Sequence, residues 1–200
     1  MSPGDRSGPD VLRLLRTGTA AEHESVERTL GLLDPELDRS RLTEVLTRMH
    51  GFWRAAEAGL DDWATRFPSD AASVTWPTRR RAALFALDLG TLGALPAETE
   101  PTLAPVTGTD AALGRLYVLE GSTLGGILID RHLTGLPSLS GVRLRAFYPY
   151  GTETGAMWHA FRRVTRDRVA RGGDADAMVA AASGTFRALA EWCRPAAAEV

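Results

Sequence analysis

A stretch of helical sequence that contains three glycines places the strongest constraint on this chain. Between Tyr117 and Ile129 the sequence reads YVLEGSTLGGILI, and its leucines keep the spacing of an amphipathic helix. A glycine in the middle of a helix costs roughly 1 kcal/mol relative to alanine. Gly121 and Gly125 are four positions apart and share one helix face, with Gly126 beside them. We therefore expect a bare strip of backbone that a flat or bulky group could approach closely.

Helical patterns dominate the rest of the chain, and strand patterns are nearly absent. The 200 residues are 44% hydrophobic, which is enough for one domain with a sizeable core. The sequence therefore predicts an all-α, single-domain bundle of multiple helices. A disordered lead-in is predicted for residues 1–8, the helical domain for residues 9–200, and a bend or interruption of the second helix near Gly51 or Gly59. The expected helices cover residues 9–33, 38–67, 76–93, 110–134, 152–171 and 174–192.

The composition excludes several classes of protein. The net charge is −2, so no overall positive field favours nucleic acid. All 23 basic residues are arginine, so any anion site must use arginine, histidine, hydroxyl or backbone donors. The single cysteine, Cys193, excludes an intrachain disulfide and a multi-cysteine metal site. With no signal-like segment or long apolar stretch, we expect a cytoplasmic protein with neither a membrane nor a nucleic-acid partner.

One of the four histidines has neighbours that suit a metal ligand. His23 lies in the first predicted helix, with Glu27 one turn later and Arg16 two turns earlier. A neutral imidazole that binds a metal generally donates its other N–H to an acceptor, often a carboxylate, and Glu27 is placed to accept it. An ordinary surface pair is the simpler interpretation of this spacing when it is taken alone.

Two regions together resemble the heme oxygenase family. The sequence from Leu12-Arg13 through Thr17 or Thr19 to His23 and Glu27 resembles the family's proximal helix. The motif YVLEGSTLGG resembles the distal helix of the bacterial members, particularly those associated with bacteriophytochromes. The segments FYPYGTETGAMWHAF and AASGTFRALAEW resemble later parts of that subgroup. The resemblance covers residues 10–193, and the glycine-bearing helix is its most specific part.

The resemblance implies a heme oxygenase that cleaves heme with O2 and electrons to biliverdin, CO and Fe²⁺. Heme, which is both substrate and cofactor, would lie between the proximal and distal helices with its iron ligated by His23. Gly121 and Gly125 would form the oxygen-side wall, and Gly126 would add flexibility. Because the sequence has no flavin or nicotinamide motif, a ferredoxin or a flavoprotein reductase is the expected electron donor. A biliverdin-accepting phytochrome is a further candidate partner.

The heme propionates need cationic or hydroxyl partners at the mouth of such a site. The first choice is Arg16, because it lies on the same helix as His23. The further candidates are Arg13, Tyr117, His159 and Arg163. The run from Arg79 to Arg81 is expected to form a solvated face or a docking patch for an acidic redox partner.

One position departs from many members of the family. The residue after the first distal glycine is often an aspartate that organises water for proton delivery, and here it is Ser122. Its hydroxyl could hold a water or could bond back to a carbonyl of its own helix. A non-catalytic heme carrier or sensor on the same fold therefore stays open as an alternative.

Two other enzyme classes are weaker alternatives. A dinuclear-iron oxygenase needs several carboxylates and histidines on at least three helices. Glu27, Glu57 and Glu120 are present, but no E-x-x-H pair accompanies them. A thiaminase-like hydrolase needs a nucleophilic cysteine in the core, and Cys193 lies at the very end of the last predicted helix.

Overall fold

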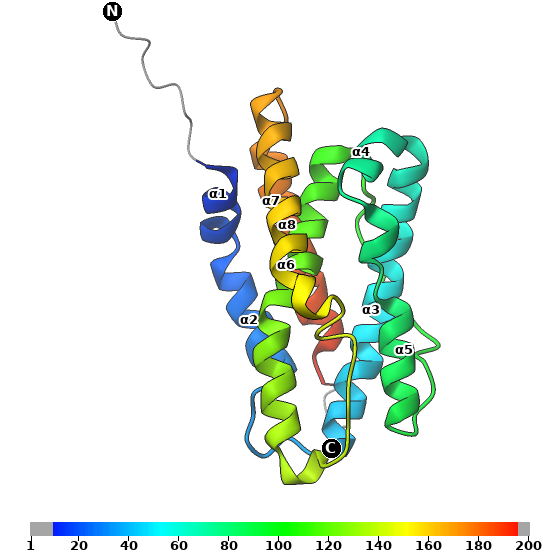
Figure 1. Cartoon of the computed structure of the whole chain (residues 1–200). Helices are drawn as coiled ribbons and strands as arrows, with labels where there is room; N and C mark the ends of the chain where they lie inside the picture. The colour runs from blue at the N-terminus through cyan, green and yellow to red at the C-terminus, as the bar shows by residue number, and fades with distance from the viewer. Residues whose placement is uncertain (1–9, 196–200) are drawn as a thin grey trace, which may run out of the picture.

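A computed structural model describes residues 10–195, which form an elongated bundle of α-helices (Figure 1). None of these residues is in a β-strand, so the predicted all-α class is confirmed. The predicted disordered lead-in at residues 1–8 lies outside the described residues. The long helices are α3 (Arg39–Arg66), α6 (Thr109–Gly135), α7 (Thr154–Ala170) and α8 (Ala175–Cys193). The shorter α-helices are α1 (Val11–Gly18), α2 (Ala20–Leu30), α4 (Pro68–Ser73) and α5 (Ala82–Thr91). The 3₁₀ turns are η1 (Trp76–Arg79), η2 (Pro137–Leu139) and η3 (Gly151–Glu153).

The first predicted helix is divided into α1 and α2 at Thr19. The backbone of Thr19 leaves the helical region (φ −122°, ψ 8°), and its hydroxyl donates to the carbonyl of Leu15 at 2.7 Å. Just before the break, a Cβ at Gly18 would lie 2.7 Å from the side chain of Val179 on α8. Close packing on α8 therefore holds the end of α1. The helix α2 ends at Gly31, which is left-handed (φ 58°) as helix ends often require.

The helix α3 runs without interruption through both of its glycines. The predicted interruption at Gly51 or Gly59 is therefore absent, and both glycines instead make room for other parts of the chain. A Cβ at Gly51 would lie 2.5 Å from the carbonyl oxygen of Thr99, and one at Gly59 would overlap the guanidinium of Arg115. Each glycine admits another part of the chain close to the helix backbone.

The predicted helix from Trp76 to Gly93 is also divided. Residues Trp76–Arg79 form η1, and α5 begins only at Ala82. The start of α5 is stabilised by Glu57, whose carboxylate accepts the backbone N–H groups of Arg81 (2.6 Å) and Ala82 (2.9 Å). This cap comes from α3, so local sequence could not reveal it.

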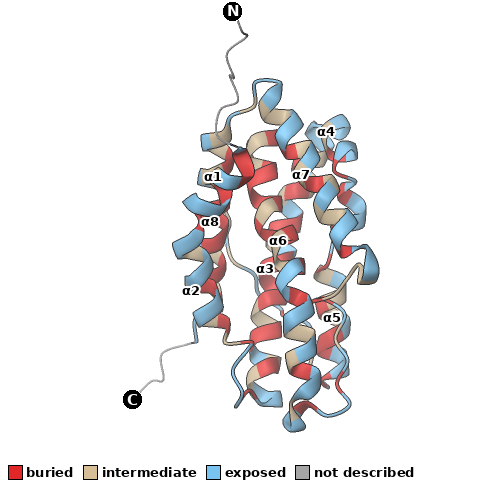
Figure 2. Ribbon diagram, turned by 60° about the vertical axis from the view of Figure 1, so that its left-hand side comes forward, coloured by how far each residue is buried: buried red, intermediate tan, exposed pale blue. Residues whose placement is uncertain are grey.

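The helix α6 lies at the centre of the bundle, and its N-terminal part is the most deeply buried (Figure 2). A close approach to α8 accounts for this burial, because a Cβ at Gly114 would overlap the carbonyl oxygen of Met178. Of the helices that the structure describes, α6 alone is long and apolar enough to cross a membrane by length and composition. The sequence was expected to contain no stretch of this kind. In the fold, 56% of the stretch is buried, as in a core helix.

Candidate functional site

The helices α2 and α6 both pack on α8 but make at most slight contact with each other. At one end, Tyr117 of α6 lies beside Thr19, where α1 meets α2. At the other end, Nε2 of His132 lies 3.0 Å from the carbonyl oxygen of Asp34, just after α2. Fifteen residues separate the two anchor positions on each segment, 19 to 34 and 117 to 132. The helices therefore run alongside each other in the same direction (Figure 1), and His23 lies at about the level of Gly121.

His23 is partly exposed and has one neighbour on its own helix and one on α8. Its side chain is 55% exposed, and its Nδ1 lies 3.7 Å from the Oε1 of Glu27. This distance is longer than a direct hydrogen bond, and a small rotation of either side chain would bring the two groups into contact. The ring also meets Phe186 of α8 edge-on, with 5.5 Å between the centroids. Within residues 10–195, no hydrogen-bond partner is found for Nε2, the nitrogen available to a ligand.

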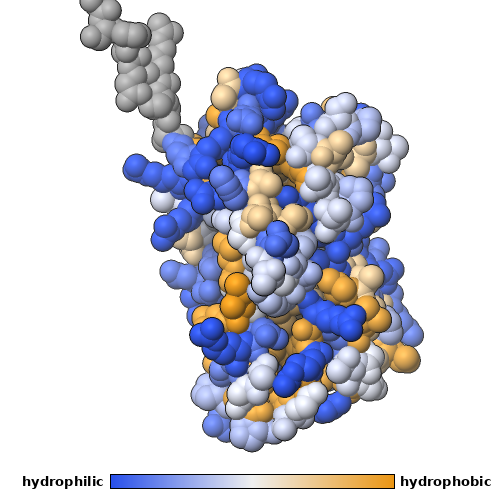
Figure 3. Space-filling view, viewed as in Figure 1, coloured by the Kyte–Doolittle hydropathy of each residue, from blue (hydrophilic) through white to orange (hydrophobic). Residues whose placement is uncertain are grey.

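Between the two anchors, α6 presents an open face made of Gly121, Leu124, Gly125 and Leu128. A Cβ at Gly121 or Gly125 would meet nothing within 4 Å. Packing within the described chain therefore does not require either glycine. Leu124 and Leu128 are 42% and 56% exposed, and Figure 3 shows apolar surface on this half of the molecule. Exposed apolar groups gathered beside bare backbone mark a site for a ligand or partner.

Gly126 lies on the other side of the helix and has a packing role. A Cβ there would overlap the backbone of Phe147, so glycine is required for the segment before η3 to cross behind α6. The resemblance assigns flexibility to Gly126, whereas the structure gives it a close backbone contact. The predicted glycines thus divide into two open ones and one that is tightly packed.

The expectation that the run from Arg79 to Arg81 is solvated is wrong for two of its members. Arg79 and Arg81 are each only 2% exposed. Arg79 forms a buried ion pair with Glu120 of α6, and Arg81 donates to the carbonyl of Leu119 and to that of Ala146 (3.1 Å). The turn at η1 directs both side chains inward, toward acceptors that lie far away in the sequence.

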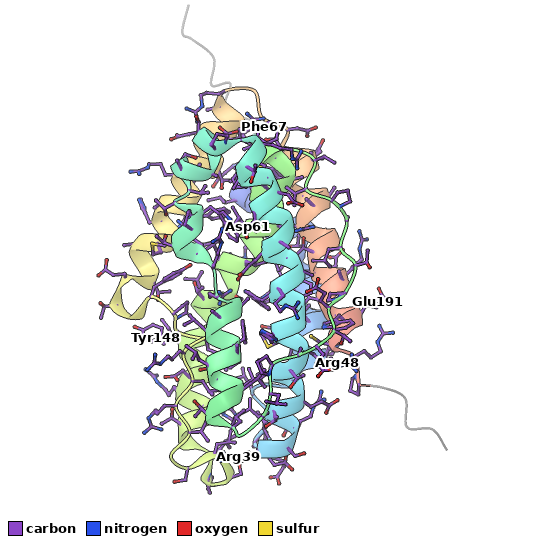
Figure 4. The ribbon with its side chains drawn as sticks, turned by 90° about the vertical axis from the view of Figure 1, so that its right-hand side faces the viewer. Arg39, Arg48, Asp61, Phe67, Tyr148 and Glu191 are labelled. Carbon is purple, nitrogen blue, oxygen red and sulfur yellow. The ribbon has the colours of Figure 1, made fainter. Side chains whose placement is uncertain are left out.

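Arg80 alone keeps a solvated position. Its side chain is 48% exposed and pairs with Asp61 on α3, which Figure 4 labels. Asp61 also accepts the indole N–H of Trp76 at 2.6 Å.

Ser122 belongs to a buried polar network behind the open face. Its hydroxyl donates to the carbonyl of Leu119 at 2.7 Å and accepts from the guanidinium of Arg81 at 2.7 Å. Nearby, the hydroxyl of Tyr150 donates to Glu120 at 2.8 Å, and burial raises the pKa of Tyr150. Sequence reasoning missed this network, because its members come from three segments that lie far apart in the sequence.

The propionate candidates are only partly brought together. Tyr117 is half-buried beside Trp158 of α7, with 5.9 Å between ring centroids. Burial raises the pKa of Tyr117, while Thr19 and the positive charge of Arg16 act in the opposite direction. Arg16 is therefore near Tyr117, at the end of the open face. The other candidates, Arg13, His159 and Arg163, are exposed on α1 and α7.

The structure offers little to the weaker alternatives. Within residues 10–195 there is no group of three or more His, Cys, Asp or Glu side chains that could hold a metal ion. Glu57 caps α5, and Glu120 is occupied by Arg79 and Tyr150. Burial raises the pKa of Cys193 to about 12, which opposes a nucleophilic thiolate.

Comparisons with known proteins place this arrangement in a family. No family model matches the chain. It is 30% identical over 135 residues to a heme oxygenase from Xanthomonas campestris pv. campestris (strain 8004), which covers 66% of this chain and 76% of that relative.

Two solved structures have a similar fold. One is the NO- and CO-bound heme oxygenase from Neisseria meningitidis, with a TM-score of 0.72, 22% identity and 96% of each chain covered. The other is heme oxygenase from Leptospira interrogans, with a TM-score of 0.69, 15% identity, and coverage of 92% of this chain and 98% of that one. The fold is therefore the all-helical, single-domain fold of these enzymes. The chain belongs to the heme oxygenase family and is an oxidoreductase.

Proposed function

We propose that this protein binds heme between α2 and the open face of α6 and degrades it to biliverdin, CO and Fe²⁺. This proposal rests on Gly121 and Gly125, because no packing within the described chain requires a glycine at either position. They lie at the level of His23, the imidazole that faces the same region. Family membership supplies the substrate class, and these residues fit a flat, apolar macrocycle whose iron an imidazole nitrogen would hold.

Each wall of the site has a distinct role in this proposal. On the proximal side, His23 would hold the iron through Nε2, and Glu27 would orient the ring through Nδ1. On the distal side, Gly121 and Gly125 let the helix backbone approach the ring, and their open space leaves room for O2. Leu124 and Leu128 cover the apolar part of the macrocycle. Heme, when bound, supplies the O2 chemistry, and the protein supplies orientation and electrostatics.

The propionates would lie at the end of the site where α1, α6 and α7 meet. Arg16 is the principal partner, because it combines a full positive charge with a position near Tyr117. Arg13, His159 and Arg163 are exposed and can reach the carboxylates without giving up another bond. Rotation of the ring about its normal is then controlled by which of these groups bind it.

Ser122 acts in this proposal by fixing the distal backbone. Its hydroxyl joins Arg81 to the carbonyl of Leu119, two residues before Gly121. Within residues 10–195, the Nε of Arg81 and the indole N–H of Trp53 are buried donors without a protein acceptor. Each could hold a water molecule behind the glycine strip.

Electrons must come from another protein. A ferredoxin or a flavoprotein reductase is the proposed donor, and the motifs shared with the bacteriophytochrome-associated subgroup favour a phytochrome as acceptor of the biliverdin. We propose a cytoplasmic location for this exchange.

Hemin titration followed by turnover tests the proposal. We expect a Soret band on binding, then its loss under O2 and a reductant, with biliverdin absorption appearing in the red. A spectrum that stays unchanged while electrons are supplied would instead identify a heme carrier.

His23→Ala should alter the ferric spectrum. A matched pair on α2 checks the orientation of His23: Glu27→Gln should weaken hemin binding, whereas Glu24→Gln, which affects only an exposed pair with Arg28, should not.

A further inference from the structure

A second unusual site lies on the opposite side of α6, at Arg115. This side chain is only 6% exposed. Within residues 10–195 no carboxylate forms an ion pair with it, in contrast to Arg79, which has Glu120. Two of its five N–H groups reach carbonyl oxygens, of Ala56 (3.5 Å) and Ala104, and its Nε has no protein partner. Burial lowers the pKa of Arg115 to about 10, because the charged form is costly away from water.

A cavity of about 120 Å³ is lined by Arg115 and by Ala104, whose carbonyl accepts from this guanidinium. Apart from Arg115, its walls are mostly apolar and come from α6, α8 and the segment before α6. Representative lining residues are Leu103, Val106, Ala111, Gly184 and Ala188. A cavity of about 150 Å³ can hold benzene, so this one suits a ligand of about five or six non-hydrogen atoms.

Gly184 keeps this cavity open. It lies in the middle of α8, where glycine is destabilising relative to alanine. A Cβ at Gly184 would meet nothing within 4 Å, so no neighbour in the described chain requires a glycine there. By contrast, Gly114 is required, because α8 packs directly against it. The space in front of Gly184 is the space beside Arg115.

The cavity is separate from the proposed heme site. At 100° per residue, Gly184 and Ala188 lie on the face of α8 opposite Phe186, the residue that meets His23. Arg115 likewise lies on the face of α6 opposite Tyr117. A group bound in the cavity would therefore have α6 and α8 between itself and heme.

We propose that this cavity binds a small organic monocarboxylate with a short, branched apolar tail. The carboxylate would compensate the buried charge of Arg115 and take its unused donors, which suit a two-point contact. The alanine, leucine and valine side chains that line the cavity would contact the tail. A chloride ion would leave this apolar space empty. The site needs no heme, so it does not depend on the proposed activity.

Isobutyrate, with six non-hydrogen atoms, is the probe for this site. Calorimetric titration and thermal unfolding are carried out on the full chain, with and without bound hemin. We expect saturable binding of isobutyrate in both forms and a rise in Tm that follows its concentration. Isobutyramide, the neutral analogue, and sodium chloride at equal ionic strength should produce neither effect. An equal response to isobutyramide, a response to chloride alone, or loss of isobutyrate binding when hemin is bound would each overturn the proposal.

Two variants locate the binding. Arg115→Met should weaken isobutyrate binding by at least about tenfold, which corresponds to about 1.4 kcal/mol. Gly184→Val fills the cavity without touching the arginine and improves helix propensity, so it tests the site even if Arg115→Met fails to fold. Gly90→Val in α5 is its control, because a Cβ there also meets nothing within 4 Å. Unchanged affinity in Gly184→Val would contradict the proposed location.

Discussion

The two halves of α6 share one helix but have different surroundings. Up to Glu120 the helix is part of the core, and Leu113, Leu116 and Leu119 are at most 1% exposed. From Gly121 onward only one side is covered, and the change from buried to exposed along α6 is visible in Figure 2. The first half stabilises the fold, and the second half uses that stability to support an open apolar face.

The comparison also separates two reasons for finding a glycine inside a helix. Gly114 and Gly126 are required because backbone from another segment approaches within the space of a methyl group. Gly121 and Gly125 face open space, so no packing within the described chain accounts for their missing side chains. Sequence spacing alone makes all four look equivalent. The following substitutions test this separation, from the largest expected effect to the smallest.

Glu120→Ala should be the most damaging change, because it leaves Arg79 as an unpaired buried charge. We expect a loss of about 3–5 kcal/mol in the free energy of unfolding, measured by urea denaturation. Arg166→Ala provides the control, because it removes an exposed pair with Asp10 and should cost at most about 1 kcal/mol. Equal losses in the two variants would contradict the assignment of the Arg79–Glu120 pair to the core.

Adjacent glycines give the sharpest matched pair. Gly126→Ala forces a methyl group into the backbone of Phe147 and should destabilise the protein by about 1–3 kcal/mol. Gly125→Ala, one residue earlier, should leave stability unchanged or raise it. Thermal and chemical unfolding of both variants measures the contrast, and a loss of similar size in Gly125→Ala would remove the distinction between open and packed glycines.

Gly121→Ala should improve the fold while harming the activity. The new methyl group meets no atom of the protein, so better helix propensity should raise stability by up to about 1 kcal/mol. The same methyl group takes space on the oxygen side of the proposed site, so heme turnover should fall although hemin still binds. Parallel unfolding and single-turnover measurements test this, and unchanged turnover would place O2 elsewhere.

Leu128→Ser should have a small effect on folding. The side chain is already 56% exposed, so the free energy of unfolding should fall by at most about 1 kcal/mol. Hemin affinity should fall by about fivefold, because burying the exposed half of a leucine is worth about 1 kcal/mol. Leu87→Ser on α5 is the control, with 57% exposure and no role in the site. Hemin titration that fails to distinguish the two variants would exclude Leu128 from the heme contact.

Local patterns predicted those parts of the fold that local forces determine. The predicted glycine-bearing helix, 110–134, nearly coincides with α6, and 174–192 with α8, because apolar periodicity continues along both. The break at Thr19 was missed, since α1 and α2 separate where α1 packs on α8. The late start of α5 was missed as well, because its cap is Glu57, 24 residues before Arg81.

The same division applies to the site. The pairing of His23 with Glu27 follows from helical spacing, and the bare strip follows from counting glycines. The burial of Arg79 and Arg81 does not, since a run of charges ordinarily indicates a solvated surface. Their acceptors on α6 are 38 to 41 residues away, and only the folded chain brings them together.

The shared support of α2 and α6 has a mechanical consequence. The two helices hardly touch, and each is positioned by its own contacts with α8. Ser183 of α8 also binds the carbonyl of Gly18 at 3.2 Å, just before the break that begins α2. The side chains of α8 therefore set the distance between α2 and α6. In the proposed function, this distance limits the thickness of a molecule that can bind between the two helices. Substitutions on α8 would change the distance while every residue of α2 and α6 stayed the same.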